Sequence, residues 1–277
     1  MLKLIPILVF LLGTADAQSP QRLMALSDVL QGTHASGVVI DVASGTAISR
    51  YGAMEEASTP GSTMKPFVLK TALDASVINE RESVHCSGRL TIKGHDLACT
   101  HPRDITVLDA RMALADSCNT YFATLARRMP TEMLVNGLRG YGLNATGTPQ
   151  SADDRALMAL GLVGVRVSPT QMAIAYRRLA QQMNTQTGGS TGVVRDGMVQ
   201  SVETGMARGA HVNGMMIGGK TGTAQDADVS WSHGWFAGIL FDPQGKAQRV
   251  IVIYIPNGNG NDAALLAKRF IEREAGR

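Results

Sequence analysis

A serine and a lysine three positions apart are the residues of this sequence best placed to do chemistry. Ser62 and Lys65 lie in the string Ser62-Thr63-Met64-Lys65, and residues with this spacing on a helix share a face, so their side chains can meet. A serine hydroxyl is a poor nucleophile until an adjacent base removes its proton. A lysine becomes that base only when burial or a nearby cation lowers its pKa. The pair therefore predicts a lysine-activated serine, with Lys220 as the candidate for the nearby cation.

The residues around Ser62 predict that it lies in the first turn of a helix. Pro60-Gly61 indicates a turn just upstream. Pro66 suits an early helical position, because it lacks an N–H group that would have little or no intrahelical partner there. The backbone N–H of Ser62 would then be free to polarise a carbonyl group.

Two further strings follow in an order that matters. Ser117-Cys118-Asn119 reads as S-x-N, and Lys220-Thr221-Gly222-Thr223 reads as K-T-G-T. Taken singly, the three motifs are also explained by a helix cap, a turn between helices and a strand end. Taken together and in this order, they are typical of serine enzymes that acylate themselves.

With these motifs and the strings around them, the sequence resembles the transpeptidase domain of penicillin-binding proteins. The resemblance runs from about residue 36 to residue 275, and it implies an α/β (α+β) fold in which an antiparallel sheet is split around a helical insertion. The matching strings are Gly61 to Phe67, Ser117 to Phe122, Ser168 to Ala173, Gly218 to Ala224 and Trp235 to Gly238.

The resemblance implies an acyltransferase that acts on D-Ala-D-Ala stem peptides of peptidoglycan, as a transpeptidase or a carboxypeptidase, and that binds β-lactams. Ser62 would carry the acyl group and Lys65 would take its proton, while Ser117 relays a proton to the leaving amine and Asn119 orients the Lys65 ammonium. No cofactor and no metal is expected. The substrate carboxylate would be bound by Lys220, Thr221, Gly222 and Thr223, and the backbone N–H groups of Ser62 and Thr223 would form the oxyanion hole.

Two other functions stay open. One is a serine β-lactamase, since class A enzymes carry a deacylating glutamate in an E-x-x-L-N string. Glu132-Met133-Leu134-Val135-Asn136 has its leucine one place early, and we interpret it as a helix that follows Pro130. The other is a non-catalytic sensor or partner protein, which would be free to lose the nucleophile that this chain retains.

The cysteines allow several interpretations. His85, Cys86, His95, Cys99 and His101 are close in sequence, a density that can indicate zinc. A disulfide between Cys86 and Cys99 is the favoured interpretation, because disulfides persist outside the cytoplasm and no standard zinc spacing is present. Free thiols are the third possibility. Cys118, inside the S-x-N string, is expected to be a small packing residue.

Composition and the N-terminal residues indicate an exported protein that works in the periplasm or outside the cell. The chain has 277 residues, 44% of them hydrophobic and 18% charged, with a net charge of +3. It can therefore build a sizeable core. No dense basic run is present, which argues against a nucleic-acid partner.

Residues 1–17 have the pattern of a signal peptide ending at Ala15-Asp16-Ala17, and no later segment is apolar enough to span a membrane. Partners other than stem peptides and β-lactams would be cell-wall proteins.

Periodicity predicts one domain at residues 36–277, after a short lead-in at 18–35, without a separate module before it. Its sheet part comprises residues 36–61 and 210–277, and its helical part comprises residues 62–209. We expect five antiparallel strands flanked by helices, with the active site where the two parts meet. The expected strands are 37–43, 46–51, 215–223, 234–241 and 248–255; the expected helices are 63–75, 106–115, 119–129, 153–163, 169–183, 196–207 and 262–274; and a polar loop is expected at 184–192.

Overall fold

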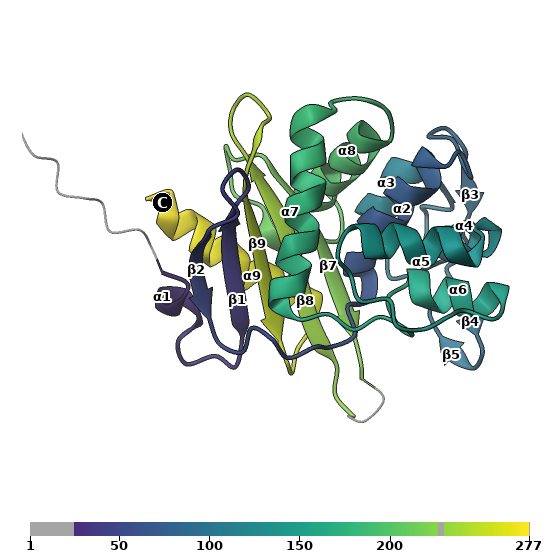
Figure 1. Ribbon diagram of the computed structural model, residues 1–277, viewed down its shortest axis with the longest axis horizontal. Coiled ribbons are helices and arrows are strands. Elements are labelled where there is room, and N and C mark those ends of the chain that lie inside the picture. Colours follow the sequence, from purple (N-terminus) through teal and green to yellow (C-terminus); the bar gives the residue numbers. More distant parts are fainter. Residues whose placement is uncertain (1–24, 227–229, 277) are drawn as a thin grey trace, which may run out of the picture.

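The computed structural model of the protein describes residues 25–226 and 230–276, and it is built around a five-stranded antiparallel sheet (Figure 1). The strand order is β2-β1-β9-β8-β7, so the first hairpin pairs with the last strand of the chain. The predicted sheet is confirmed. The predicted signal peptide at residues 1–17 lies outside the described residues. The strands are β1 (Ser36–Asp41), β2 (Ala47–Tyr51), β7 (Ile217–Ala224), β8 (His233–Phe241) and β9 (Ala247–Ile255).

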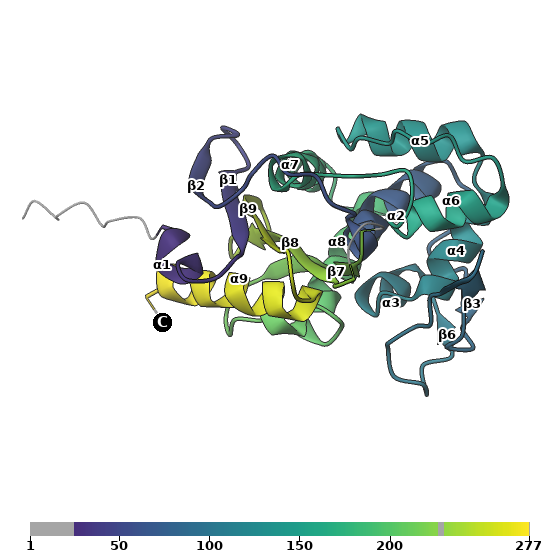
Figure 2. The same ribbon diagram turned by 90° about the horizontal axis from the view of Figure 1, so that it is seen from below.

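The side chains of the sheet alternate between two cores, as expected for strands covered on both faces. In β9, Val250 and Val252 belong to the core that contains α7 (Pro169–Thr185), whereas Ile251 and Ile253 belong to the core that contains α9 (Gly260–Glu274). Figure 2 shows α7 and α9 on opposite faces of the sheet. The short helix α1 (Ser27–Leu30) lies beside α9.

The remaining helices lie beyond β7, the edge strand of the sheet (Figure 1). The helix α8 (Gly189–Glu203) packs against β7 on one side and against α3 (Ala110–Ala115) on the other, so it joins the sheet to the helical part. The helices are α2 (Lys65–Asp74), α3 (Ala110–Ala115), α4 (Asn119–Arg128), α5 (Thr131–Gly140), α6 (Ala152–Ala159) and α8 (Gly189–Glu203), with the 3-10 turns η1 (Gly61–Met64) and η2 (Arg208–Ala210).

Several local expectations differ from the structure. The helix predicted at 153–163 ends at Ala159. The predicted helix at 106–115 begins only at Ala110, because Val107 and Leu108 form β6, which pairs with β3 (Val84–His85). A small hairpin of β4 (Thr91–Ile92) and β5 (His95–Asp96) was not predicted. The predicted loop at 184–192 is shorter, since α7 continues to Thr185 and α8 already begins at Gly189.

None of the helices in the described ranges combines the length and the apolar character needed to cross a membrane.

Candidate active site

Ser62 lies in the first turn of a helix, as the sequence predicts. It belongs to η1, which runs directly into α2 at Lys65. Gly61 has φ of 56°, in the region that favours glycine, and its N–H donates to Gly161 O at 3.0 Å. This turn leaves the Ser62 side chain half-buried. The nucleophile candidate is therefore held at a fixed position and remains accessible.

The Lys65 side chain is completely buried and its ammonium binds the S-x-N motif. Its Nζ donates to Ser117 O at 2.7 Å, to Ser117 Oγ at 3.1 Å and to Asn119 Oδ1 at 2.7 Å. These three acceptors, rather than the Ser62 hydroxyl, are its hydrogen-bond partners in the described part of the chain. Burial lowers the pKa of Lys65 to about 7. Burial is thus the main cause of the lowered pKa, and it tunes Lys65 to exchange a proton near neutrality.

Ser117 occupies a strained backbone position at the end of α3. Its φ is 55°, the left-handed region that costs a non-glycine residue about 1–2 kcal/mol. The N–H groups of Ser117 and Cys118 donate to Leu114 O at 3.3 Å and Ala113 O at 2.9 Å, which is the hydrogen-bond pattern that ends many helices at a glycine. Serine in the glycine position points to a functional need for its hydroxyl.

Asn119 connects the Lys65 ammonium to a second segment. Its Oδ1 accepts from Lys65, and its Nδ2 donates to Leu97 O at 3.0 Å. Cys118, directly before it, is the N-cap of α4, and its sulfur accepts a hydrogen bond from Tyr121 N. The S-x-N motif is therefore the link between the end of α3 and the start of α4.

Lys220 approaches this cluster from β7, the edge strand of the sheet. Its side chain is fully buried, and its Nζ donates to Thr221 O at 3.0 Å. Burial, and then the charge of Lys65, lower the pKa of Lys220 well below its ordinary value. The two lysines therefore interact electrostatically, and the structure brings together the first and the last of the predicted motifs.

The strand β7 passes very close to the turn that carries Ser62. A Cβ atom added at Gly222 would lie 2.6 Å from Pro60 O and 3.1 Å from Thr63 Cγ2, so only glycine fits there. Thr223 is exposed, and its hydroxyl accepts a hydrogen bond from Gly260 N at 3.0 Å. The Thr221 hydroxyl donates to Met206 O at 3.4 Å.

The sequence matches the family model of the penicillin binding protein transpeptidase domain over residues 36–272. The chain belongs to this family.

Solved structures of transpeptidase domains share the fold. The chain superposes on the D,D-transpeptidase domain of a peptidoglycan glycosyltransferase from Eggerthella lenta with a TM-score of 0.75 and 22% identity, covering 90% of this chain and 79% of that one. For the apo transpeptidase domain of penicillin-binding protein 3 from Burkholderia pseudomallei the TM-score is 0.76, the identity 20% and the coverage 90% of each chain. No curated protein matches the sequence significantly.

Sequence reasoning missed the residues that anchor the turn carrying Ser62 in this transpeptidase domain. The carbonyl of Thr59 accepts from Trp235 Nε1 at 3.1 Å and contacts His233 Nε2 at 2.7 Å. The hydroxyl and N–H of Thr59 both donate to Asp226, which also pairs with Arg166 at 3.1 Å. Their signal in the sequence is weak, since they lie in four separate segments and only folding brings them together.

A carboxyl group also lies within the site of this transpeptidase domain. Asp116 directly precedes Ser117, and burial raises its pKa, although the charge of Lys220 acts in the opposite direction. Glu132, by contrast, is exposed in the first turn of α5. The helix predicted after Pro130 is thus confirmed, and its glutamate is solvent-facing.

Proposed function

We propose that the chain is a serine acyltransferase that acts on the D-Ala-D-Ala ends of peptidoglycan stem peptides and is acylated by β-lactams at Ser62. The observation that carries this proposal is the buried Lys65 side chain, one helical turn after Ser62 and bound to both polar residues of the S-x-N motif. A buried amine with a pKa of about 7 can accept the proton of a serine hydroxyl at neutral pH.

The hydrogen bonds of Lys65 fit both of its protonation states. As an ammonium it donates to all three acceptors on Ser117 and Asn119. As a neutral amine it has two donors, which suffice for Ser117 O and Asn119 Oδ1, and one lone pair that can accept a proton from Ser62. Lys65 would therefore remain oriented by the same partners after it gives up a proton.

The acylation step then follows from these positions. Ser62 Oγ attacks the penultimate carbonyl while its proton passes to Lys65, and the tetrahedral oxyanion is stabilised by the N–H groups of Ser62 and Thr223. The C–N bond breaks, and the departing D-alanine amine receives the proton from Lys65 through the Ser117 hydroxyl. Lys220, with Thr221 and Thr223, binds the terminal carboxylate, and the negative charge of that carboxylate favours the ammonium form of this buried lysine.

The acyl-enzyme has two productive fates, attack by a stem-peptide amine or attack by water. The first gives a crosslink, and the second gives trimming of the peptide. In either case the substrate lies outside the cytoplasmic membrane, so the protein would act there. The signal-peptide pattern of residues 1–17 agrees with this location.

Intact-mass measurement after incubation with penicillin tests the proposal. The expected result is one penicilloyl adduct on the unmutated protein and on Ser83→Ala, which removes an exposed serine hydroxyl, but none on Ser62→Ala. No adduct with no penicillin consumed would contradict acyl transfer and favour a non-catalytic partner. Rapid consumption of penicillin without a lasting adduct would indicate a β-lactamase.

A second measurement separates transpeptidase from carboxypeptidase. A peptide ending in D-Ala-D-Ala is incubated with and without an acceptor amine, and both the released D-alanine and the products are quantified. A transpeptidase forms the amide product when the acceptor is present. A carboxypeptidase gives only the shortened peptide in both reactions.

A further inference from the structure

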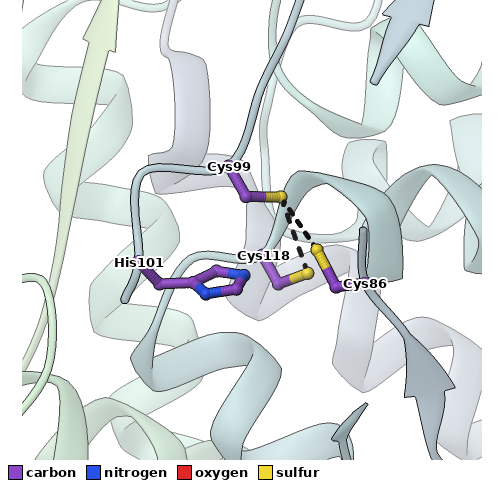
Figure 3. Close-up of side chains that lie close together, drawn as sticks. All are labelled: Cys86, Cys99, His101 and Cys118. Carbon is purple, nitrogen blue, oxygen red and sulfur yellow. Dashed lines mark hydrogen bonds between the residues drawn. The ribbon is translucent and has the colours of Figure 1, made fainter. Parts of the chain in front are cut away.

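Three cysteines and a histidine converge beside the S-x-N motif. Cys86 follows β3, Cys99 and His101 lie in the segment after β5, and Cys118 caps α4. Their ligand atoms all lie within 4.8 Å of one another (Figure 3). All three cysteines are free thiols in this structure. We refer to Cys86, Cys99, His101 and Cys118 as the thiol–imidazole cluster.

The sulfur atoms have the separations of a tetrahedral metal site. Cys86 Sγ and Cys99 Sγ are 3.5 Å apart, and Cys99 Sγ and Cys118 Sγ are 3.7 Å apart. Two thiolates bound to one zinc ion at 2.3 Å in a tetrahedron lie about 3.8 Å apart. A disulfide would instead need one pair of sulfurs to approach to about 2.05 Å. The observed spacing is thus compatible with ligands around one ion and too long for a disulfide.

The imidazole of His101 supplies an independent observation. His101 is buried, and its Nδ1 lies 3.0 Å from Pro102 O. The neutral tautomer that satisfies this carbonyl has its proton on Nδ1 and its lone pair on Nε2. That Nε2 atom is buried and has no hydrogen-bond partner among the described residues. An unpaired buried nitrogen is costly. A backbone carbonyl that holds the other ring nitrogen is the usual support of a metal-binding histidine.

We propose that Cys86, Cys99, His101 and Cys118 together bind one zinc ion. Three thiolates and one neutral imidazole fill all four positions of a tetrahedral site, which is the composition of structural rather than catalytic zinc. Binding releases the thiol protons and leaves the site with a net charge of −1. A cavity of about 700 Å³ lined in part by Cys86, Cys99 and His101 gives the ion a path of entry.

The position of the cluster gives the ion a role in orienting the active site, and this part of the inference rests on the proposed function. Cys118 stands between Ser117 and Asn119, and the amide of Asn119 donates to Leu97 O, just before Cys99. An ion bound to Cys86, Cys99 and Cys118 would therefore fix the S-x-N motif to the segment that contains Leu97. In this arrangement Cys118 is a positioning residue.

Metal content of the reduced protein tests the binding itself. The protein is incubated with zinc chloride under a reductant that does not bind zinc, separated from free metal and analysed by plasma mass spectrometry. The expected stoichiometry is one zinc per chain in the unmutated protein, in Ser62→Ala and in His95→Ala, which changes an exposed histidine of the neighbouring hairpin. Cys99→Ser and His101→Ala should bind at least tenfold more weakly.

Cobalt and chelation measurements keep the proposal falsifiable if a variant fails to fold. Cobalt(II) bound to the unmutated protein should show thiolate charge-transfer absorption and the intense visible bands of a tetrahedral ion. Chelation should lower the melting temperature of the unmutated protein, and added zinc should restore it.

Two results would overturn zinc binding: reduced protein that retains no metal, or protein that takes up no zinc because Cys86 and Cys99 are already bridged, as a count of one remaining thiol would show. Because Ser62→Ala should still bind zinc, failure of acyl transfer and failure of metal binding are distinguishable. Zinc removal should slow acylation of the unmutated protein by penicillin at least tenfold. An unchanged rate would overturn the positioning role.

Discussion

At the scale of single residues, the site is defined by two buried lysine side chains. Lys65 and Lys220 are both completely buried, and burial is the main reason that the pKa of each is lowered. The Lys65 side chain keeps three acceptors, whereas Lys220 donates to Thr221 O. Lys65 is thus arranged to exchange a proton, and a substrate carboxylate beside Lys220 would favour the charged form of that lysine.

The pKa of Lys65 leads to a prediction about acylation. Below pH 7 the side chain is protonated and cannot accept the Ser62 proton, so the second-order rate constant for acylation by penicillin should rise about tenfold per pH unit. Above about pH 7, where Lys65 is neutral, the rate should level off. Stopped-flow measurement with a fluorescent penicillin gives the profile.

The matched variants for this profile are two lysine substitutions. Lys246→Met, at an exposed lysine, should keep the same pH profile. Lys65→Met should acylate at least a hundredfold more slowly, with no inflection near pH 7. An inflection that survives in Lys65→Met would assign the titration to another group.

Ser117 gives a prediction that separates stability from chemistry. Ser117→Gly and Ser117→Ala both lose the hydroxyl that binds Lys65, so acylation should fall at least a hundredfold in both. Only glycine relieves the φ of 55°, and the glycine variant should therefore be about 1 kcal/mol more stable than the alanine variant. Urea denaturation measures the difference, and equal midpoints would mean that the position carries no strain.

At the scale of elements, the site depends on one edge strand pressed against one turn. The strand β7 has a hydrogen-bonded neighbour only in β8, and its other edge faces η1. Gly222 makes that approach possible, since a Cβ there would lie 2.6 Å from Pro60 O. The glycine of the K-T-G motif is therefore a packing requirement.

Gly222→Ala should push β7 away from η1, the turn that carries Ser62. The added methyl group meets backbone rather than a flexible side chain, so we expect a loss of about 1–3 kcal/mol in the free energy of unfolding and acylation reduced at least tenfold. Gly140→Ala is the control, because a Cβ there meets nothing within 4 Å. Wild-type acylation in Gly222→Ala would show that the spacing between β7 and η1 is not critical.

The sequence predicted those elements whose pattern is local. Apolar alternation identified β1, β8 and β9, and the predicted helix starts at 169 and 119 coincide with the starts of α7 and α4. The start of α8 was missed because Gly189-Ser190-Thr191-Gly192 is a poor helix former that tertiary packing holds in a helix. The strands β3 to β6 have only two residues each, too few to show a period.

The same distinction applies to the site. The motif spacing predicted which residues are brought together, because Ser62 and Lys65 belong to one turn and S-x-N is a single cap. It did not predict the partners of Thr59, since these residues come from separate segments that only the folded chain assembles. Of the thiol–imidazole cluster, the sequence grouped Cys86, Cys99 and His101 but left out Cys118. Cys118 illustrates the limit: its burial was foreseen, but its contact with Cys99 was not.

At the scale of the whole molecule, the hydrogen bonds and the ion pair of Asp226 connect the sheet to the helical part. This residue follows β7, and its carboxylate accepts hydrogen bonds from Thr59 and Arg166. Thr59 lies just before the turn that carries Ser62, and Arg166 lies in the segment before α7. A backbone bridge between Ser58 and Val167 lies beside it. The relative placement of Ser62 and Lys220 therefore rests on contacts outside the three motifs.

Asp226→Asn tests this connection, and the measured quantity is the free energy of unfolding. Loss of the charged acceptor should cost about 1–3 kcal/mol at pH 7, while Asp104→Asn, at an exposed aspartate, should cost little. Hydrogen bonds from Thr59 outweigh burial and hold the pKa of Asp226 below its ordinary value of 3.8. The contribution is then present above that value and is lost as pH falls through the folded pKa. Chemical denaturation should give a constant difference between variant and wild type from pH 7 to pH 5, and a smaller one below about pH 4.

The pairing of β1 with β9 also sets the order in which the molecule can form during synthesis. Ser36 lies opposite Tyr254 and Asp41 opposite Arg249, so the first hairpin must wait for a segment made some two hundred residues later. Contacts this distant in sequence slow folding, and the helical part becomes complete long before its sheet. A nascent chain that has emerged only as far as α8 therefore carries Ser62, Lys65 and S-x-N without Lys220, and it gains a complete active site only in the last steps of its own production.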